Sequence, residues 1–185
     1  MRITDSRYDR DRLRLALAHR LIALEARTHT IRQATQLSDD RIRRMYRDYF
    51  ASRGENRVRR RRGKSPRQMS FFRRSLEHEQ EAAVLGSMVR ACGLVLRFPQ
   101  GFRPGLEDVA RFCDVYETFS GLWPDPPHIS FEHAWHLWQV ICRDDEYVLA
   151  TCPDCTALWL RDTLEILPDN CPACRRGLFD ERTTR

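Results

Sequence analysis

Two pairs of cysteines near the carboxyl end are the feature that most constrains this chain. Cys152 and Cys155 form one Cys-x-x-Cys turn, and Cys171 and Cys174 form a second turn after fifteen intervening residues. Each turn can direct two thiolates at one ion, so the two turns together supply four sulfur ligands in a tetrahedron. Four protein ligands leave no open coordination position, which favours a structural site. The pattern therefore predicts one structural zinc ion per chain.

The alternatives for these cysteines are a dithiol redox centre and an iron–sulfur cluster. Redox chemistry needs only one pair and usually accompanies a βα unit, which the sequence does not indicate. A module of about 30 residues is too small to hold together by its core alone. Zinc would supply the missing folding free energy, on the order of 10 kcal/mol. We expect a small hairpin between the turns, formed by residues 157–160 and 164–167.

The other three cysteines stand singly in apolar helical patterns. They are Cys92, Cys113 and Cys142. An odd total of seven, without a signal peptide, argues against a disulfide framework. We expect these three thiols to be small buried side chains in a reducing compartment.

Apolar periodicity predicts a mainly helical fold. Leu13, Leu17, Leu21 and Leu24 recur at spacings of four, four and three, which places them on one face of a helix over 10–27. Further helices are expected over 71–92, 106–119 and 130–142. We expect four segments: N-terminal helices in 1–52, a basic linker in 53–70, a helical domain in 71–146, and a zinc-binding module with a basic tail in 147–185.

Residues 28–50 predict a helix-turn-helix-like unit. A short helix is expected over 28–35, and Ser38 is a good N-cap for a second helix that runs to about Phe50. A helix-turn-helix presents its second helix to the major groove of DNA. In this chain the second helix carries several arginines opposite its apolar face, and the arginine fork suits both phosphates and guanine edges.

Positive charge is concentrated in and after this unit. Between Arg41 and Arg74 there are 14 Lys and Arg against two acids, whereas the rest of the chain has a net charge of −6. A basic block on an otherwise acidic chain is typical of polyanion-binding proteins. The candidate DNA-binding residues are Arg41, Arg43, Arg44, Arg47, Arg57, Arg59, Arg60, Arg61, Arg62 and Lys64.

Several other functions find little support in the sequence. No Gly-rich phosphate loop, nucleophile elbow or carboxylate cluster stands out, and His133 and His136 do not follow the His-Glu-x-x-His order of metalloproteases. No segment approaches the roughly 18 apolar residues of a membrane span. We therefore expect a cytoplasmic protein without enzymatic activity. Two alternatives stay open: an interaction scaffold whose arginines form only a solvated linker, and a nucleic-acid-processing enzyme with a structural zinc module.

Three stretches, in this order, resemble the FlhC family of flagellar master transcriptional activators of bacteria. The first is ARTHTIRQATQLSDDRIRRMYRDYF, in which Leu-Ser precedes a basic helix. The second is GKSPRQMSFF, a basic Gly-Lys-x-Pro stretch that leads to an aromatic pair. The third is CPDC followed by CPAC. The resemblance runs from about Leu13 to Cys174 and so covers nearly the whole chain.

This resemblance implies a mostly helical protein whose four-cysteine zinc site maps onto Cys152, Cys155, Cys171 and Cys174. It further implies assembly with FlhD into a heterohexamer of two FlhC and four FlhD subunits. Such a complex binds double-stranded DNA in the promoter regions of flagellar operons and recruits RNA polymerase. The segment before Gly63 is richer in arginine than the corresponding part of the family.

Overall fold

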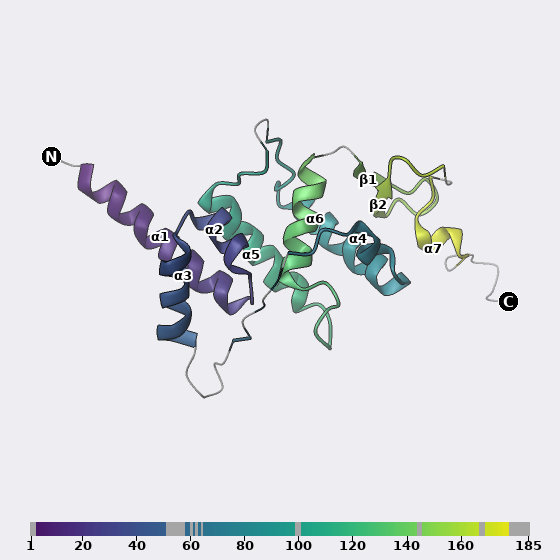
Figure 1. The fold of residues 1–185 in the computed structure, drawn as a ribbon. Helices are drawn as coiled ribbons and strands as arrows, with labels where there is room; N and C mark the ends of the chain where they lie inside the picture. Colours follow the sequence, from purple (N-terminus) through teal and green to yellow (C-terminus); the bar gives the residue numbers. More distant parts are fainter. Residues whose placement is uncertain are drawn as a thin grey trace. The chain divides into compact units, whose positions relative to one another are not determined.

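The fold is mainly helical, as the sequence predicts, and its C-terminal part brings four cysteines together (Figure 1). The structure is a computed structural model that describes residues 3–50, 58–59, 61, 63, 65–98, 101–143, 146–166 and 169–177, with side chains from residue 8 onward. Contacts divide the chain into two compact units. Unit 1 comprises Met1–Pro66 and Arg103–Asp114, and unit 2 comprises Arg67–Phe102 and Val115–Arg185.

Unit 1 is built from the N-terminal helices and the first part of one helix from later in the chain. They are α1 (Ile3–Ala23), α2 (Thr28–Thr35), α3 (Asp39–Met45), the π-helix η1 (Tyr46–Phe50) and the first part of α5 (Leu106–Ser120). Helix α2 contacts both α1 and α3, and α3 continues directly into η1. The predicted helix over 28–35 is therefore confirmed.

Helix α1 buries only part of the predicted leucine stripe. Leu17 and Leu21 are buried, whereas Leu13 is exposed. The helix ends at Ala23 because Glu25 takes a left-handed conformation with φ of 59°. The N–H of Ala26 then donates to the carbonyl of Leu21 at 2.9 Å, which closes the helix end and turns the chain toward α2. The expected end near residue 27 was thus too late, and the helix starts earlier than residue 10.

A three-residue turn joins α2 to α3. Gln36 adopts a left-handed conformation that ends α2. The Thr35 hydroxyl oxygen accepts the N–H of Leu37 at 3.3 Å, so the buried turn keeps its backbone donor satisfied. Ser38 accepts the N–H of Arg41 at 3.4 Å, and the predicted N-cap of the second helix is confirmed.

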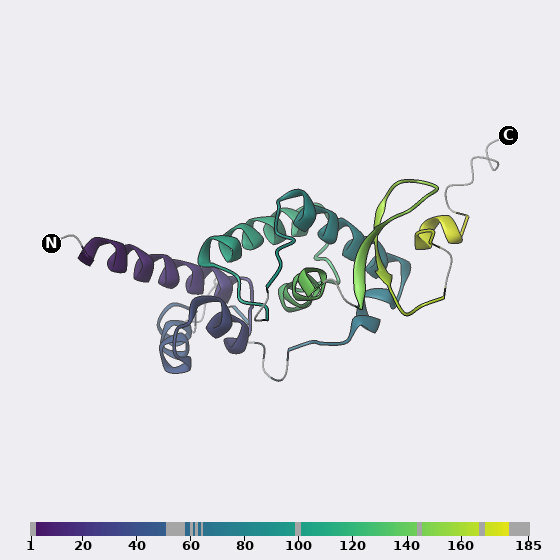
Figure 2. The same ribbon diagram turned by 90° about the horizontal axis from the view of Figure 1, so that it is seen from above.

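Unit 2 is organised around α4, which contacts elements both before and after it in the sequence (Figures 1 and 2). Its described elements are the 3₁₀-helix η2 (Met69–Arg73), α4 (Leu76–Ala91), the end of α5, α6 (Phe131–Arg143), β1 (Tyr147–Thr151), β2 (Leu158–Asp162) and the short α7 (Pro172–Arg175). Helix α4 packs against η2, α6, both strands and α7.

Buried polar contacts fix the core of unit 2. Trp138, fully buried on α6, donates its indole N–H to the carbonyl of Leu94 at 2.8 Å. The buried carboxylate of Glu81 on α4 accepts the N–H of Ile129 at 2.9 Å and lies 2.8 Å from Nδ1 of His128. These contacts hold the segment before α6 against α4 and satisfy a charge that would otherwise be costly to bury.

One helix prediction for this part of the chain was wrong in detail. The single helix expected over 71–92 is a 3₁₀-helix that ends at Arg73, followed by α4. Ser75 separates them as the N-cap of α4 and accepts the N–H of His78 at 3.5 Å. The helices expected over 106–119 and 130–142 are present as α5 and α6.

The C-terminal hairpin differs from the one expected between the cysteine turns. Its strands are β1 and β2, paired antiparallel with Leu149 opposite Leu160, so the first cysteine turn lies between them. The backbone supports this turn, since Cys152 donates its N–H to Ala157 at 2.9 Å. The expected second strand, 164–167, is not a strand over the part that the structure describes, and Leu164 is exposed.

Candidate metal centre and basic helix

The two cysteine turns are positioned by the hairpin and by α7. Cys152 directly follows β1, and the turn from Cys152 to Thr156 leads back into β2. Cys171 is the N-cap of α7, and its sulfur accepts the N–H of Cys174 at 3.4 Å. The backbone of this second turn is tied to the first, because Cys171 also donates its N–H to the sulfur of Cys152 at 3.2 Å.

The four sulfur atoms are close enough to share one ion. The Sγ atoms of Cys152, Cys155, Cys171 and Cys174 all lie within 4.8 Å of one another. Cys155 Sγ is 3.6 Å from Cys171 Sγ, far longer than the roughly 2.05 Å of a disulfide. Zinc–sulfur bonds of about 2.3 Å in a tetrahedron separate neighbouring sulfurs by about 3.8 Å. The predicted four-cysteine cluster is therefore present, and its dimensions fit a metal ion.

The thiol pKa values differ among the cysteines of the cluster. Burial opposes the ionisation of Cys152, but donation from the backbone N–H groups of Cys171 and Cys155 lowers the pKa of its thiol to about 6. Burial and hydrogen bonds from its thiol to the neighbouring sulfurs raise the pKa of Cys174 far above its usual range, and the pKa of Cys171 is also raised. One thiolate is thus readily formed, whereas several thiolates together require a cation.

A small apolar core surrounds the cluster. Cys152, Trp159 and Cys171 are buried together, with Ala150 and Ala173 packed against them. The guanidinium carbon of Arg175 lies 5.3 Å from the centre of the Trp159 ring, which covers the outer side of this core. The core is too small to fold alone, in keeping with a need for a metal cross-link.

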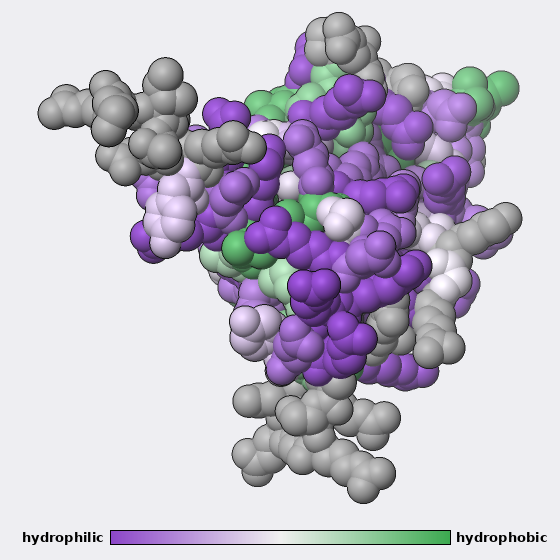
Figure 3. Space-filling model, turned by 60° about the vertical axis from the view of Figure 1, so that its left-hand side comes forward, coloured by the Kyte–Doolittle hydropathy of each residue, from purple (hydrophilic) through white to green (hydrophobic). Residues whose placement is uncertain are grey.

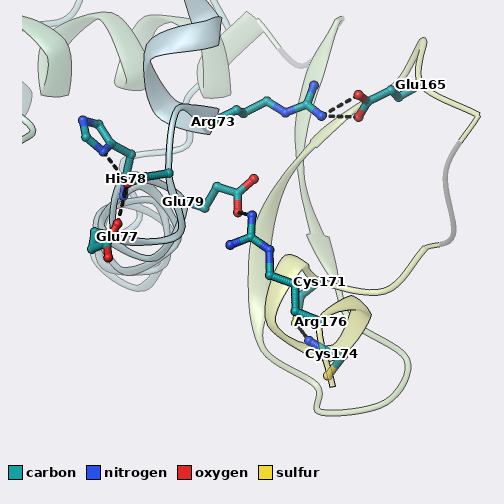
Figure 4. Close-up of polar contacts among 9 residues, drawn as sticks. Arg73, Glu77, His78, Glu79, Glu165, Cys171, Cys174 and Arg176 are labelled. Carbon is teal, nitrogen blue, oxygen red and sulfur yellow. Dashed lines mark hydrogen bonds and ion pairs between the residues drawn. The ribbon is translucent and has the colours of Figure 1, made fainter. Parts of the chain in front are cut away.

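Ion pairs of two arginines attach the cysteine module to the helical part of unit 2 (Figure 4). Arg73, at the end of η2, lies 2.5 Å from Glu165 in the segment after β2, and 3.6 Å from Asp162. Arg176, just after α7, lies 3.3 Å from Glu79 on α4. Sequence reasoning missed these residues, because partners some 90 positions apart leave no local pattern.

The acidic residues of α4 do not form a second metal site. Glu77 accepts from the Ser75 hydroxyl, Glu79 pairs with Arg176, and Glu81 binds the segment before α6. Among the residues that the structure describes, the four cysteines are the sole group of three or more Cys, His, Asp or Glu placed to share an ion. The three carboxylates are thus held by separate partners.

The single cysteines divide into two kinds. Cys113 and Cys142 are buried, as the sequence predicts. Cys92 is exposed, so that prediction was wrong for this residue. The reason is that α4 ends at Ala91, and Cys92 occupies the C-cap position at the helix end.

Helix α3 presents arginines on its outer side. Its buried residues are Ile42 and Met45, which face the core of unit 1. The predicted contact residues on this helix and on η1 are all exposed: Arg41, Arg43, Arg44 and Arg47. The structure therefore places these four candidate residues together on the outer side of one continuous helical segment.

The arginines of this segment differ in their partners. Arg43 lies 3.2 Å from Asp40, and Arg47 lies 3.7 Å from Asp48. No carboxylate among the described residues pairs with Arg41 or Arg44. These two guanidinium groups carry the positive charge of α3 that is not locally neutralised.

The basic flank is only partly described. Arg59 is exposed, whereas Arg61 forms an ion pair with Glu25 at 2.8 Å. No local sequence pattern indicates this pair, which places one predicted contact residue against Glu25, in the turn at the end of α1. The remaining candidates lie outside the described residues: Arg57, Arg60, Arg62 and Lys64.

The surface drawn in Figure 3 is largely hydrophilic, with hydrophobic residues confined to smaller areas. None of the helices in the described parts of the chain combines the length and apolar content needed to cross a bilayer. Comparison with protein-family models and with curated proteins finds no match to this chain.

Proposed function

We propose that the chain is the DNA-binding subunit of a transcriptional activator of the FlhC type. In this proposal α3 and η1 contact double-stranded DNA in promoter regions, and a structural zinc ion stabilises the C-terminal module. The observation that carries the proposal is the pair Arg41 and Arg44, exposed on one helix without a carboxylate partner among the described residues. Guanidinium groups without a carboxylate partner can bind phosphates and guanine edges without first breaking an ion pair.

The turn between α2 and α3 supports the same role. It is short, its N-cap is formed by Ser38, and the two helices pack against each other. The second helix of such a unit is the one that enters the major groove. Arg59 follows on the same unit and supplies additional charge for the DNA backbone.

Zinc is the metal we propose for the four cysteines. A full set of thiolate ligands in a tetrahedral arrangement is typical of structural zinc sites. When bound, the ion would neutralise the thiolates and cross-link the turn after β1 to α7. The ion pairs of Arg73 with Glu165 and of Arg176 with Glu79 then connect the cross-linked module to η2 and α4.

The partners we propose rest on the three sequence stretches that resemble the FlhC family. They are an FlhD-type subunit, in a complex of two FlhC and four FlhD, and RNA polymerase. The complex would act in the cytoplasm at the promoters of flagellar operons. Co-expression with the FlhD-type protein of the same organism, followed by mass measurement of the purified complex, tests this assembly. A chain that purifies alone despite abundant partner would contradict it.

The DNA-binding role is tested by fluorescence anisotropy with a promoter duplex and a random duplex of equal length. The variant carries Arg41→Ala and Arg44→Ala, and the matched control is Arg90→Ala, an exposed arginine of α4. We expect the double variant to lose about tenfold or more in promoter affinity, because base contacts contribute about 1–3 kcal/mol each. Unchanged binding by the double variant, or an equal loss in the control, would contradict the assignment to α3.

A further inference from the structure

An apolar pocket of about 450 Å³ lies between α4 and the cysteine module, within unit 2. One wall is the face of α4 that carries Ala83, Val84 and Met88. A volume of this size falls in the range of small-molecule binding sites, which are about 300–1,000 Å³.

The facing wall is formed by the metal-binding module itself. It includes Leu158 and Trp159 of β2 and Pro172 of α7, and Leu122 lies at the edge of the pocket. Trp159 is buried in the core beside the cysteines and also lines the pocket. The same side chain therefore contributes to the metal site and to the pocket wall. A wall fixed in this way is preformed, which lowers the entropy lost when a ligand binds.

The charges around the pocket indicate a neutral ligand. Glu79 is the one Asp, Glu, Lys or Arg in the lining, and its carboxylate is already paired with Arg176 at 3.3 Å (Figure 4). Gln80 also lines the pocket, is exposed, and forms no hydrogen bond with another described residue. The lining therefore offers apolar surface, no unpaired Asp, Glu, Lys or Arg, and the amide of Gln80, which can donate and accept hydrogen bonds; the buried Trp159 Nε1 also has no hydrogen-bond partner among the described residues.

We propose that this pocket binds a neutral, mainly hydrocarbon small molecule whose single polar group meets the amide of Gln80. A single side chain of a partner protein would fill only part of the volume, which favours a compact small molecule as the occupant. The pocket borders the cysteine cluster, since Cys171 is part of its lining, and the proposal goes beyond DNA binding. It holds or fails independently of the proposed transcriptional role.

The test uses the metal-loaded full chain and two fluorescent probes. N-phenyl-1-naphthylamine is neutral and apolar, and 1-anilinonaphthalene-8-sulfonate has a similar ring system with a negative charge. We expect saturable binding of the neutral probe at one site per chain, and about tenfold weaker binding of the anionic probe, because no unpaired cation lines the pocket.

Two variants place the probe in this pocket. Ala83→Trp fills the space from α4, and Leu122→Asp puts a charge at the edge, where the side chain is 58% exposed and a change is tolerated by the fold. The matched control is Leu164→Asp, because Leu164 is a 79% exposed leucine that does not line the pocket. Each pocket variant is expected to weaken binding of the neutral probe by about tenfold, and the control to leave it unchanged.

The outcomes decide the proposal in either direction. Saturable binding that both pocket variants weaken and the control preserves supports it. If Ala83→Trp fails to fold or to retain metal, the binding of the neutral probe by Leu122→Asp alone tests the proposal. Absence of saturable binding, equal affinity for the two probes, or loss in the Leu164→Asp control would overturn it and leave the pocket to a side chain of a macromolecular partner.

Discussion

Arg73 faces Glu165 with its Nη2 atom 2.5 Å from each carboxylate oxygen, and this contact joins the 3₁₀-helix before α4 to the segment after β2. The hydrogen bonds to Glu165 raise the pKa of Arg73, although burial opposes the charge. This ion pair, together with packing, holds the cysteine module against the helical part of unit 2.

Removing this contact should weaken unit 2 without removing its metal. We expect Arg73→Ala to lower the free energy of unfolding by about 1 kcal/mol, since the pair is charge-assisted but partly exposed. Denaturant unfolding, followed by the fluorescence of the tryptophans, measures the change. Arg90→Ala, at an exposed arginine of α4, is the matched control and should change stability by less than about 0.5 kcal/mol.

A cysteine ligand should be indispensable for metal binding, whereas a solvent-exposed cysteine should not. We expect Cys155→Ser to reduce the metal content from one ion per chain to a substoichiometric level, because a neutral hydroxyl is a poor replacement for a thiolate. Cys92→Ser makes the same chemical change at an exposed position outside the cluster. Elemental analysis of both variants after dialysis is the measurement, and a full complement of metal in Cys155→Ser would contradict the proposed site.

The ion pair of Arg61 with Glu25 predicts a variant that binds DNA more tightly. Glu25→Gln should release the Arg61 guanidinium and remove a nearby negative charge, which raises duplex affinity by about twofold to threefold at low salt. Glu107→Gln removes the same charge from an exposed position of α5. Anisotropy titrations should show a larger gain for Glu25→Gln, and equal gains would assign the effect to net charge alone.

Two buried histidines predict a loss of stability in mild acid. Burial, aided by the positive charge of Arg143, lowers the pKa of His136 below its ordinary value of 6.5. Burial also lowers the pKa of His78, with the charge of His128 acting in the same direction. The unfolded chain therefore binds more protons than the folded chain as the pH falls below about 6.5.

The free energy of unfolding should consequently be highest above pH 6.5 and decline below it, by at most about 1.4 kcal/mol per pH unit for each histidine. His136→Gln should flatten this decline. His29→Gln, at an exposed side chain of α2, should leave it in place. Urea unfolding at a series of pH values measures both slopes, and a stability that rises toward acid would contradict the assignment.

Local patterns in the sequence were sufficient for much of the fold. The N-cap at Ser38, the helix over 28–35 and the four-cysteine cluster all depend on residues a few positions apart, or on metal-ligand spacing. In such cases the chemistry of a short segment fixes its structure. The same holds for α5 and α6, whose apolar faces repeat with the period of a helix.

Features that depend on distant partners were missed. Glu25 ends α1 in a left-handed conformation that the leucine pattern did not reveal, because a non-glycine residue carries no clear signal for it. The pairing of β1 with β2 depends on residues before the first cysteine turn, so the expected hairpin was displaced. Arg73 and Glu165, like Arg61 and Glu25, meet only after the chain has folded.

The salt dependence of duplex binding by the metal-loaded chain tests whether α3 and its basic flank contact DNA. If α3 and its basic flank neutralise DNA phosphates, the logarithm of the association constant should fall linearly with the logarithm of salt concentration, with a slope of about −3 or steeper. Arg41→Ala and Arg44→Ala together should make this slope shallower by about one to two. A chain that binds no duplex at low ionic strength, or whose affinity is independent of salt, would contradict the claim.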